Sequence, residues 1–113
     1  MRKMDKKIEN QLRLVLMDVC EIALKEIDGF QWLTHRVNYF NFSKSLKVVC
    51  VFDTNENLSY FKSENSRDKL ATLIELRLAA IDIKVKSMVD HIIYDTEENC
   101  SRDNNGNWSA RLS

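Results

Sequence analysis

The densest group of chemically capable side chains lies in the last third of the sequence. There the apolar run from Val89 to Tyr94 passes into Asp95-Thr-Glu-Glu-Asn-Cys100, and a polar turn, Asn104-Asn-Gly-Asn107, precedes Trp108. Neighbouring carboxylates can serve as general acid and base. Carboxylates that follow a strand are more often solvated, however, and the run matches no catalytic signature. We therefore predict a protein that is not an enzyme and has no catalytic residues.

Cysteine and histidine are too dispersed to indicate a transition-metal site. Tetrahedral sites use ligand pairs at C-x-x-C or H-x-x-x-H spacing, whereas Cys20, Cys50, Cys100, His35 and His91 stand far apart. An odd number of widely spaced cysteines also argues against a disulfide framework and favours an intracellular, cytoplasmic protein. We predict neither a bound metal ion nor a cofactor.

Two segments place oxygen ligands at calcium-like spacings. The run from Asp53 to Asn57, with Glu64, reproduces the oxygen ligands of an EF-hand loop, but Leu58 replaces the required glycine and a predicted strand precedes the loop. The run from Asp103 to Gly106 lacks ligands at two demanding positions. Turns explain the abundance of asparagine better than calcium does.

A nuclease-like pattern is present but poorly placed. Asp53 together with Asp82-Ile-Lys84 gives a D…D-x-K arrangement, whose carboxylates must lie on adjacent strands to share a metal ion. A predicted helix separates the two parts here. With only Gly29 and Gly106, the chain also lacks a glycine-rich phosphate loop. We expect neither chemistry.

Nucleic-acid binding is the alternative function that the sequence leaves open. Trp32, Arg36, Phe40 and Tyr60 offer aromatic and basic side chains of the kind that stack on bases. The overall charge gives no support, because 17 basic residues balance 17 acidic ones and phosphate contacts need a basic surface. Aromatic residues that alternate along a strand also belong more often to a core.

Hydrophobic periodicity predicts a first helix over residues 4–28, with Gly29 as its left-handed cap. Two strands of a hairpin follow at 31–40 and 46–53, joined through 41–45. The second strand is nearly continuous in apolar residues, which predicts a central strand. Residues 53–57 are expected to leave the sheet as a loop.

The second half predicts one more helix and one more strand. Ser66 is a candidate N-cap for a helix over 67–82, residues 83–88 fit either an edge strand or a continued helix, and a last strand covers 89–96. The chain is therefore predicted to be one α+β domain over 1–113. Its expected architecture is a two-layer α-β-β-α-β arrangement, with a small, mainly antiparallel sheet and two helices.

The N-terminus and the hydropathy pattern predict no membrane association. Arg2, Lys3, Lys6 and Lys7 have no continuous apolar core behind them, so no signal peptide is expected. A membrane span would need about 18 or more consecutive apolar residues, and none is present. The basic first residues contrast with the acidic run 95–103, which favours head-to-tail pairing but is more typical of solvated termini.

Protein–protein contact is the function that the pattern favours, with a homodimer as the expected state and a further protein partner left open. The apolar stripe of the first helix is wider than one face of a small sheet needs. Aromatic residues also gather in the predicted connections, where they serve either a partner or the rim of the core: Phe40, Phe42, Tyr60 and Phe61.

Several runs resemble a group of small bacterial proteins that commonly carry the label "Fis family transcriptional regulator". These runs are Trp32-Leu-Thr-His-Arg-Val-Asn38, Leu46-Lys-Val-Val-Cys-Val-Phe52, Asp95-Thr-Glu-Glu-Asn-Cys100 and Asn105-Gly-Asn-Trp108. The resemblance covers most of the chain. It implies no site residues, because its motifs have no known chemistry.

The tail yields a last expectation. A lone tryptophan in a polar segment gains by covering its large apolar surface. We therefore predict that Trp108 folds back onto the sheet edge or onto a neighbouring subunit. In doing so it would hold Asp95 to Asn99 in a fixed loop.

Overall fold

The most apolar strand of the chain is the middle strand of a three-stranded sheet, as predicted. In the computed structural model, which describes residues 3–113 apart from the side chain of Ser43, β2 (Lys47–Phe52) lies between β1 (Phe30–Arg36) and β3 (Ile92–Thr96). β1 is antiparallel to β2, whereas β3 is parallel to it. The prediction of an α+β fold is confirmed. The sheet is mixed, however, rather than mainly antiparallel.

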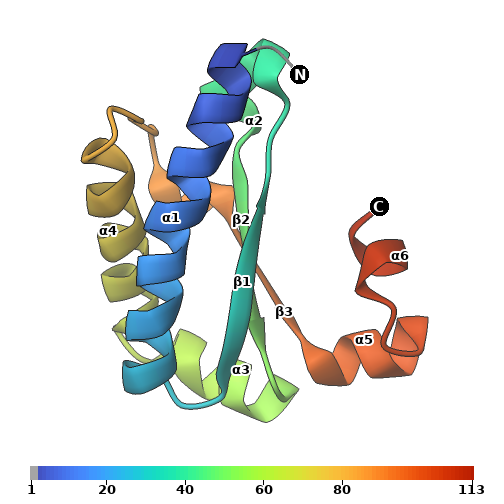
Figure 1. Cartoon of the computed structure of the whole chain (residues 1–113). Coiled ribbons are helices and arrows are strands. Elements are labelled where there is room, and N and C mark those ends of the chain that lie inside the picture. Colours follow the sequence, from blue (N-terminus) through green and yellow to red (C-terminus); the bar gives the residue numbers. More distant parts are fainter. Residues whose placement is uncertain (1–2) are drawn as a thin grey trace.

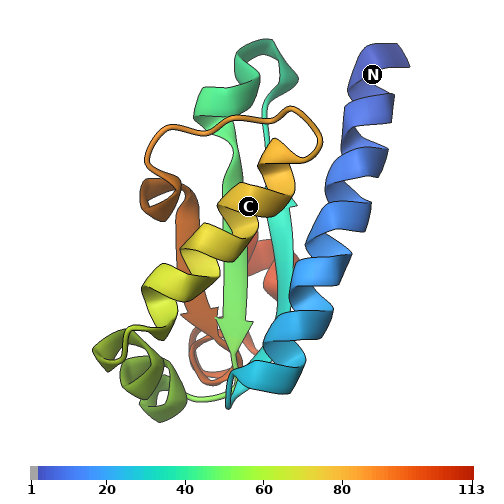
Figure 2. The ribbon, with the colours of Figure 1, turned by 90° about the vertical axis from the view of Figure 1, so that its left-hand side faces the viewer.

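Two long helices cover one face of this sheet (Figures 1 and 2). They are α1 (Lys3–Glu26) and α4 (Ser66–Ala79), which pack against each other as well as against the strands. The core between helices and sheet contains the side chains from alternate positions of β2, namely Val48, Cys50 and Phe52. A single apolar layer between the two helices and this face therefore stabilises the fold.

The turn after α1 requires glycine. Gly29 has a φ of +84°, and a Cβ atom there would lie 2.7 Å from Cβ of Asn57. The pairing of β1 with β2 then shifts between Phe30 and Trp32. Because of this bulge, Phe30 and Leu33 both pack into the core under α1, whereas Trp32 takes the other face of the sheet.

The connection from β1 to β2 is longer and more helical than predicted. β1 ends at Arg36, and a 3-10 turn, η1 (Tyr39–Asn41), leads into the short helix α2 (Phe42–Ser45). Asn38 closes this connection, since its amide donates to Oγ of Ser45 at 2.8 Å and its side chain accepts from the amide of Phe40 at 3.0 Å.

The segment predicted to leave the sheet as a loop instead starts a helix, α3 (Asn55–Ser63). Thr54 caps it by accepting a hydrogen bond from the amide of Asn57 at 3.1 Å. α4 follows almost directly. Its N-cap residue is Asn65 rather than the predicted Ser66, and its side chain makes no capping hydrogen bond.

Residues 83–88 form neither the edge strand nor the continued helix that the sequence left open. α4 ends at Ala79, the backbone turns through Asp82 at a φ of +61°, and an irregular segment leads to a 3-10 turn, η2 (Met88–His91). Buried side chains hold this segment on the core, namely Ile83, Val85 and Met88. The path returns the chain to the end of the domain where β2 starts, so β3 runs parallel to β2.

The last residues form two helices that the sequence analysis did not predict. α5 (Glu97–Asn104) starts directly after β3, and α6 (Trp108–Leu112) folds back after a left-handed turn at Asn105. They lie on the side of the sheet opposite α1 and α4 (Figure 1). Val49 and Val51, which lie outside the main core cluster, are nevertheless fully buried on this second face.

No helix in residues 3–113 combines the length and apolarity needed to cross a bilayer.

Candidate functional site

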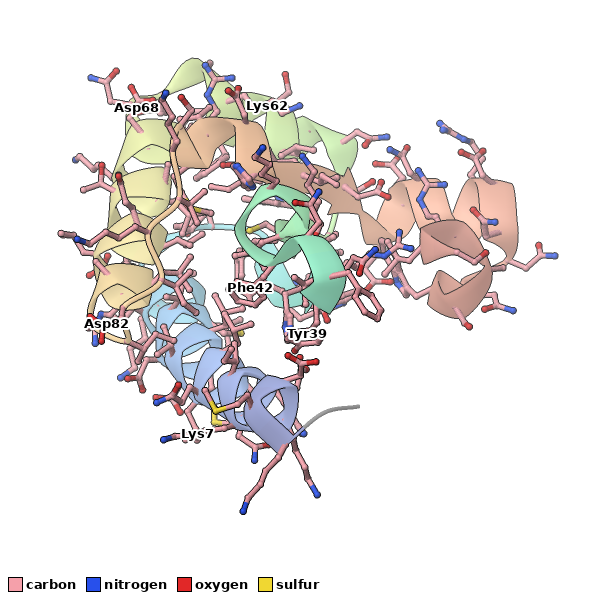
Figure 3. All side chains as sticks on the ribbon, turned by 90° about the horizontal axis from the view of Figure 1, so that it is seen from above. Lys7, Tyr39, Phe42, Lys62, Asp68 and Asp82 are labelled. Carbon is pink, nitrogen blue, oxygen red and sulfur yellow. The ribbon has the colours of Figure 1, made fainter. Side chains whose placement is uncertain are left out.

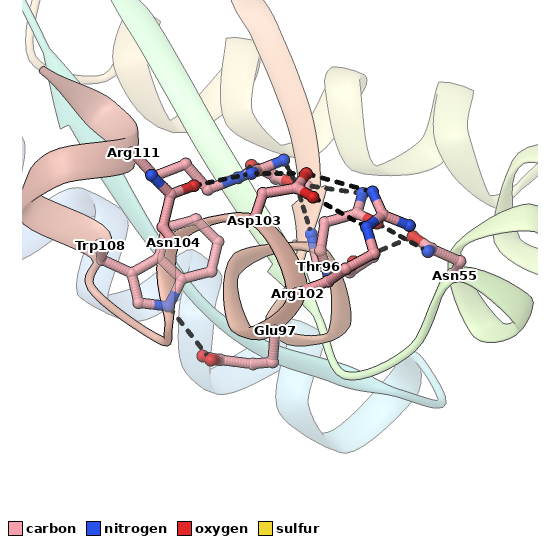
Figure 4. A network of polar contacts seen from close by, with 10 residues as sticks. Asn55, Thr96, Glu97, Arg102, Asp103, Asn104, Trp108 and Arg111 are labelled. Atoms are coloured by element: carbon pink, nitrogen blue, oxygen red, sulfur yellow. Dashed lines mark hydrogen bonds and ion pairs between the residues drawn. The ribbon is translucent and has the colours of Figure 1, made fainter.

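The carboxylate of Glu97 accepts hydrogen bonds from two tryptophans, Trp32 and Trp108. Figure 4 shows the one from Trp108. Nε1 of Trp32 donates to Oε1 of Glu97 at 2.7 Å, and Nε1 of Trp108 donates to Oε2 at 3.1 Å. The two indole rings meet edge to face, with 4.8 Å between centroids. Glu97 thus satisfies both indole donors while the rings cover each other.

A second charged contact holds α6 against the end of β3. Arg111 forms a two-pronged ion pair with Asp95, in which Nε lies 2.5 Å from Oδ2 and an Nη atom lies 3.0 Å from Oδ1. The same guanidinium reaches Asp103 and Asn104. Burial alone would raise the pKa of Asp95, but the hydrogen bond and charge of Arg111 outweigh it and lower that pKa. The neighbouring guanidinium of Arg102 similarly lowers the pKa of Asp103 to about 2.

The two acidic runs of the sequence are copies of one structural motif. Phe52-Asp-Thr-Asn-Glu-Asn57 and Tyr94-Asp-Thr-Glu-Glu-Asn99 share the pattern aromatic-Asp-Thr-x-Glu-Asn. In each copy the strand ends, the aspartate accepts from the next amide, and the threonine caps a helix by accepting from the asparagine amide three residues on. Both runs are predicted from the sequence as loops, whereas the repeated pattern identifies them as helix starts.

The two copies lie side by side because they end adjacent parallel strands. The side chain of Asn55 accepts from Oγ1 of Thr96 at 2.9 Å and donates to Oδ1 of Asn99 at 2.7 Å. Its backbone amide donates to Glu98 at 2.8 Å. Ligands of open α/β sheets bind at such carboxyl ends. Here the polar groups bind one another, so the arrangement fixes α3 and α5 instead.

The metal patterns considered in the sequence do not converge. Asp53 accepts hydrogen bonds from the amide of Thr54 and the side chain of Asn57, and these contacts lower its pKa. Asp82, the other half of the nuclease-like pattern, follows α4, whose end lies at the opposite end of the domain from the end of β2 (Figure 2). Within residues 3–113, no group of three or more His, Cys, Asp or Glu side chains is placed to hold a metal ion.

The aromatic face considered for nucleic-acid stacking does not form. Trp32 is occupied by Trp108 and Glu97, as described above. Of the other residues considered, Arg36 lies on β1 with Trp32, whereas Phe40 lies in the β1–β2 connection and Tyr60 in α3.

A groove with apolar side chains in its lining lies between α1 and β1. This groove, of about 410 Å³, is lined by Glu9, Arg13, Leu16, Met17, Cys20, Leu33, Thr34 and His35. Met17 and Leu24, both on α1, are 57% and 52% exposed. We define the α1 flank as Arg13, Met17, Glu21 and Leu24, which recur at spacings of three and four and share one side of the helix. Two residues of the flank, Arg13 and Met17, line the groove together with Leu33, Thr34 and His35 of β1.

A polar cluster is formed by Glu9 and His35, which line the groove, and by Tyr39. Tyr39 lies beside the N-terminal part of α1 (Figure 3). His35 lies 3.0 Å from one oxygen of Glu9 and 3.1 Å from the other, and the hydroxyl of Tyr39 donates a short hydrogen bond to the same carboxylate. Burial opposes ionisation of Glu9, but the hydrogen bonds from Tyr39 and His35 prevail and lower its pKa. Burial and the charge of Glu9 raise the pKa of Tyr39. The cluster ties α1 to β1 and to η1.

The groove does not assemble a nucleophile and base. Cys20 lies eleven residues after Glu9 on α1, which corresponds to about 16 Å along the helix axis. Because His35 contacts Glu9, the thiol of Cys20 is out of its reach. The buried thiols are also poor nucleophiles, since burial raises the pKa of Cys50 to about 12 and also raises that of Cys100.

No protein-family model, curated protein or solved structure matches the chain. The resemblance stated in the sequence analysis therefore stays a prediction.

Proposed function

We propose that the chain is a non-catalytic cytoplasmic protein that acts through protein–protein contacts and works as a homodimer. The observation that carries this proposal is the α1 flank. Met17 and Leu24 expose more than half of their surface beside a groove with an apolar floor. Burying such side chains stabilises an association by about 25 cal/mol per Å² of apolar surface, and clustered exposure of this kind marks interaction sites.

The open edge of the sheet supports the same proposal. Within the described residues, β1 pairs only with β2, and its outer edge has no strand beside it. Edge strands present unpaired backbone donors and acceptors to other chains. The flank and the edge together offer both apolar surface and backbone hydrogen bonds to a partner.

The alternative is a nucleic-acid-binding regulator, and one observation favours it. The first half of α1, from Lys3 to Arg13, carries four basic and two acidic side chains. The C-terminal helices add nothing to this surface, because α5 carries Glu97, Glu98 and Asp103 against Arg102.

Two measurements on the full chain test the proposal. Light scattering after size-exclusion chromatography should give the mass of a dimer. A titration with generic nucleic acid at increasing salt should show no binding, whereas phosphate contacts would give binding that weakens steeply with salt. A monomer at all concentrations would overturn the homodimer, and salt-sensitive binding would favour the regulator.

A further inference from the structure

The α1 flank carries charge of opposite sign in its two halves. From Lys3 to Arg13, α1 has four basic and two acidic side chains, whereas from Leu14 to Glu26 it has one basic and three acidic. On the flank itself, Arg13 lies one turn before Met17 and Glu21 lies one turn after it. Both charged side chains are exposed, and neither forms an ion pair within residues 3–113.

A surface of this kind is complementary to itself in one orientation. If two copies of α1 lie antiparallel about a two-fold axis at Met17, residues equally distant from Met17 meet. Arg13 of each copy then faces Glu21 of the other, and the two Met17 side chains meet on the axis. A parallel pairing would instead place Arg13 against Arg13 and Glu21 against Glu21. Closed two-fold pairing is also the commonest symmetry of homo-oligomers.

The edge of β1 fits the same axis. α1 and β1 run in opposite directions, joined by the turn at Gly29 (Figure 1). Leu33 and Thr34, near the middle of β1, line the same groove as Met17. A two-fold axis at Met17 therefore passes close to the middle of β1 and sets the two outer edges antiparallel, an orientation in which strands pair readily.

We propose that the α1 flank and the outer edge of β1 bind a second copy of this chain in antiparallel orientation, with Arg13 of each copy against Glu21 of the other. This inference rests on the homodimer proposed above and specifies its interface. It requires no ligand and no other protein.

Charge reversal tests whether Arg13 of one copy faces Glu21 of the other. Arg13→Glu places glutamates against each other at both symmetric contacts, and Glu21→Arg places arginines against each other. Each variant alone should halve the solution mass at a concentration where the unmodified chain is dimeric. When the two variants are mixed, every contact again joins opposite charges, so the mixture should regain the mass of a dimer. The double variant Arg13→Glu/Glu21→Arg should dimerise by itself.

Two further variants control for folding and for non-specific effects. Met17→Lys places like charges on the axis and should give a monomer, whereas Leu76→Lys replaces an exposed leucine of α4 and should leave the dimer intact. The circular dichroism spectrum should be unchanged in all exposed-site variants, and each should keep a cooperative thermal transition. The melting temperature of the monomeric variants should fall only by the amount that loss of the dimer contact removes.

The outcomes separate the two proposals. A dimer that survives Arg13→Glu, Glu21→Arg and Met17→Lys would overturn this interface while leaving the homodimer in place. Failure of the mixed variants to associate, when each alone is monomeric, would overturn the antiparallel register. An unmodified chain that is always monomeric would overturn both proposals.

Discussion

Trp32, in the first strand, and Trp108, in the last helix, meet edge to face with 4.8 Å between ring centroids and donate to the same carboxylate, Glu97. The expectation that Trp108 folds back is confirmed. It covers the outward face of β1 through Trp32, however, and Asp95 to Asn99 form a strand end and a helix start instead of a loop.

Removing this contact should destabilise the fold. Trp108→Ala should lower the free energy of unfolding by about 1 to 3 kcal/mol, less than a fully buried tryptophan would, because the ring is half-buried. Deletion of residues 101–113 should cost at least as much. Urea unfolding measures both, with Ser109→Ala as the exposed control on the same helix. In a Trp32→Phe background the emission of Trp108 should be blue-shifted, and a solvated emission maximum with unchanged stability would contradict this packing.

Glu97 should contribute more to the stability of the fold than another glutamate in the first turn of a helix does. Glu97→Gln leaves one oxygen to accept from two indoles, so we expect a loss of about 1 to 2 kcal/mol. Glu56→Gln makes the same chemical change in the first turn of α3, where the side chain is exposed. Chemical denaturation of the two variants should show little change for Glu56→Gln. Equal losses would mean that only the helix dipole matters.

The cluster around Glu9 should make the stability of the fold decrease as the pH falls. Its pKa is lower in the folded state than the ordinary value of 4.5, so its contribution is complete above that value and is lost as pH falls through the lowered one. Melting temperatures from pH 7 to pH 3 should therefore fall less steeply for Glu9→Gln than for the unmodified chain. Other carboxylates whose pKa is lowered, such as Asp95, contribute equally to the stability of both proteins, so their effect cancels in the difference between the two curves. Parallel curves would remove the proposed role of Glu9.

A charge in the central strand should unfold the domain. Cys50 of β2 is fully buried in the main core cluster, on the same face of the sheet as Val48 and Phe52. An aspartate at this position would have no partner for its charge. Cys50→Asp should give no cooperative thermal transition, whereas Cys50→Ala should fold with a modest loss. A cooperatively folding Cys50→Asp protein would show that burial at this position is not essential.

Divalent metal ions should not stabilise the chain. Calcium, magnesium or zinc at millimolar concentration should leave the melting temperature unchanged, because the oxygens of Asp53 and Asp95 already accept hydrogen bonds from neighbouring groups. A rise of several degrees that disappears in Asp53→Asn or Asp95→Asn would revive a metal site.

Elements that are buried on one side or completely can be predicted from the sequence alone. The apolar stripe of α1 and the unbroken apolar run of β2 identified the long helix and the central strand within a few residues. Hydrophobic spacing reports directly which side of an element is buried. The starts of α3 and α5 were also encoded locally, in the repeated aromatic-Asp-Thr-x-Glu-Asn run, but aspartate, asparagine and threonine favour turns as well as helix caps.

The direction of β3, the partner of Trp32 and the exposure of the α1 flank depend on long-range packing. The direction of β3 depends on the path of residues 80–91 over the core, where the sequence shows neither helical nor strand periodicity. Trp32 of β1 and Glu97 after β3 meet across the intervening strand β2, on the face of the sheet that α5 and α6 cover. Met17 and Leu24 are exposed because the sheet ends at β1, so α1 covers the core with one side and leaves the flank without a strand beneath it. Such long-range relationships are not contained in local spacing.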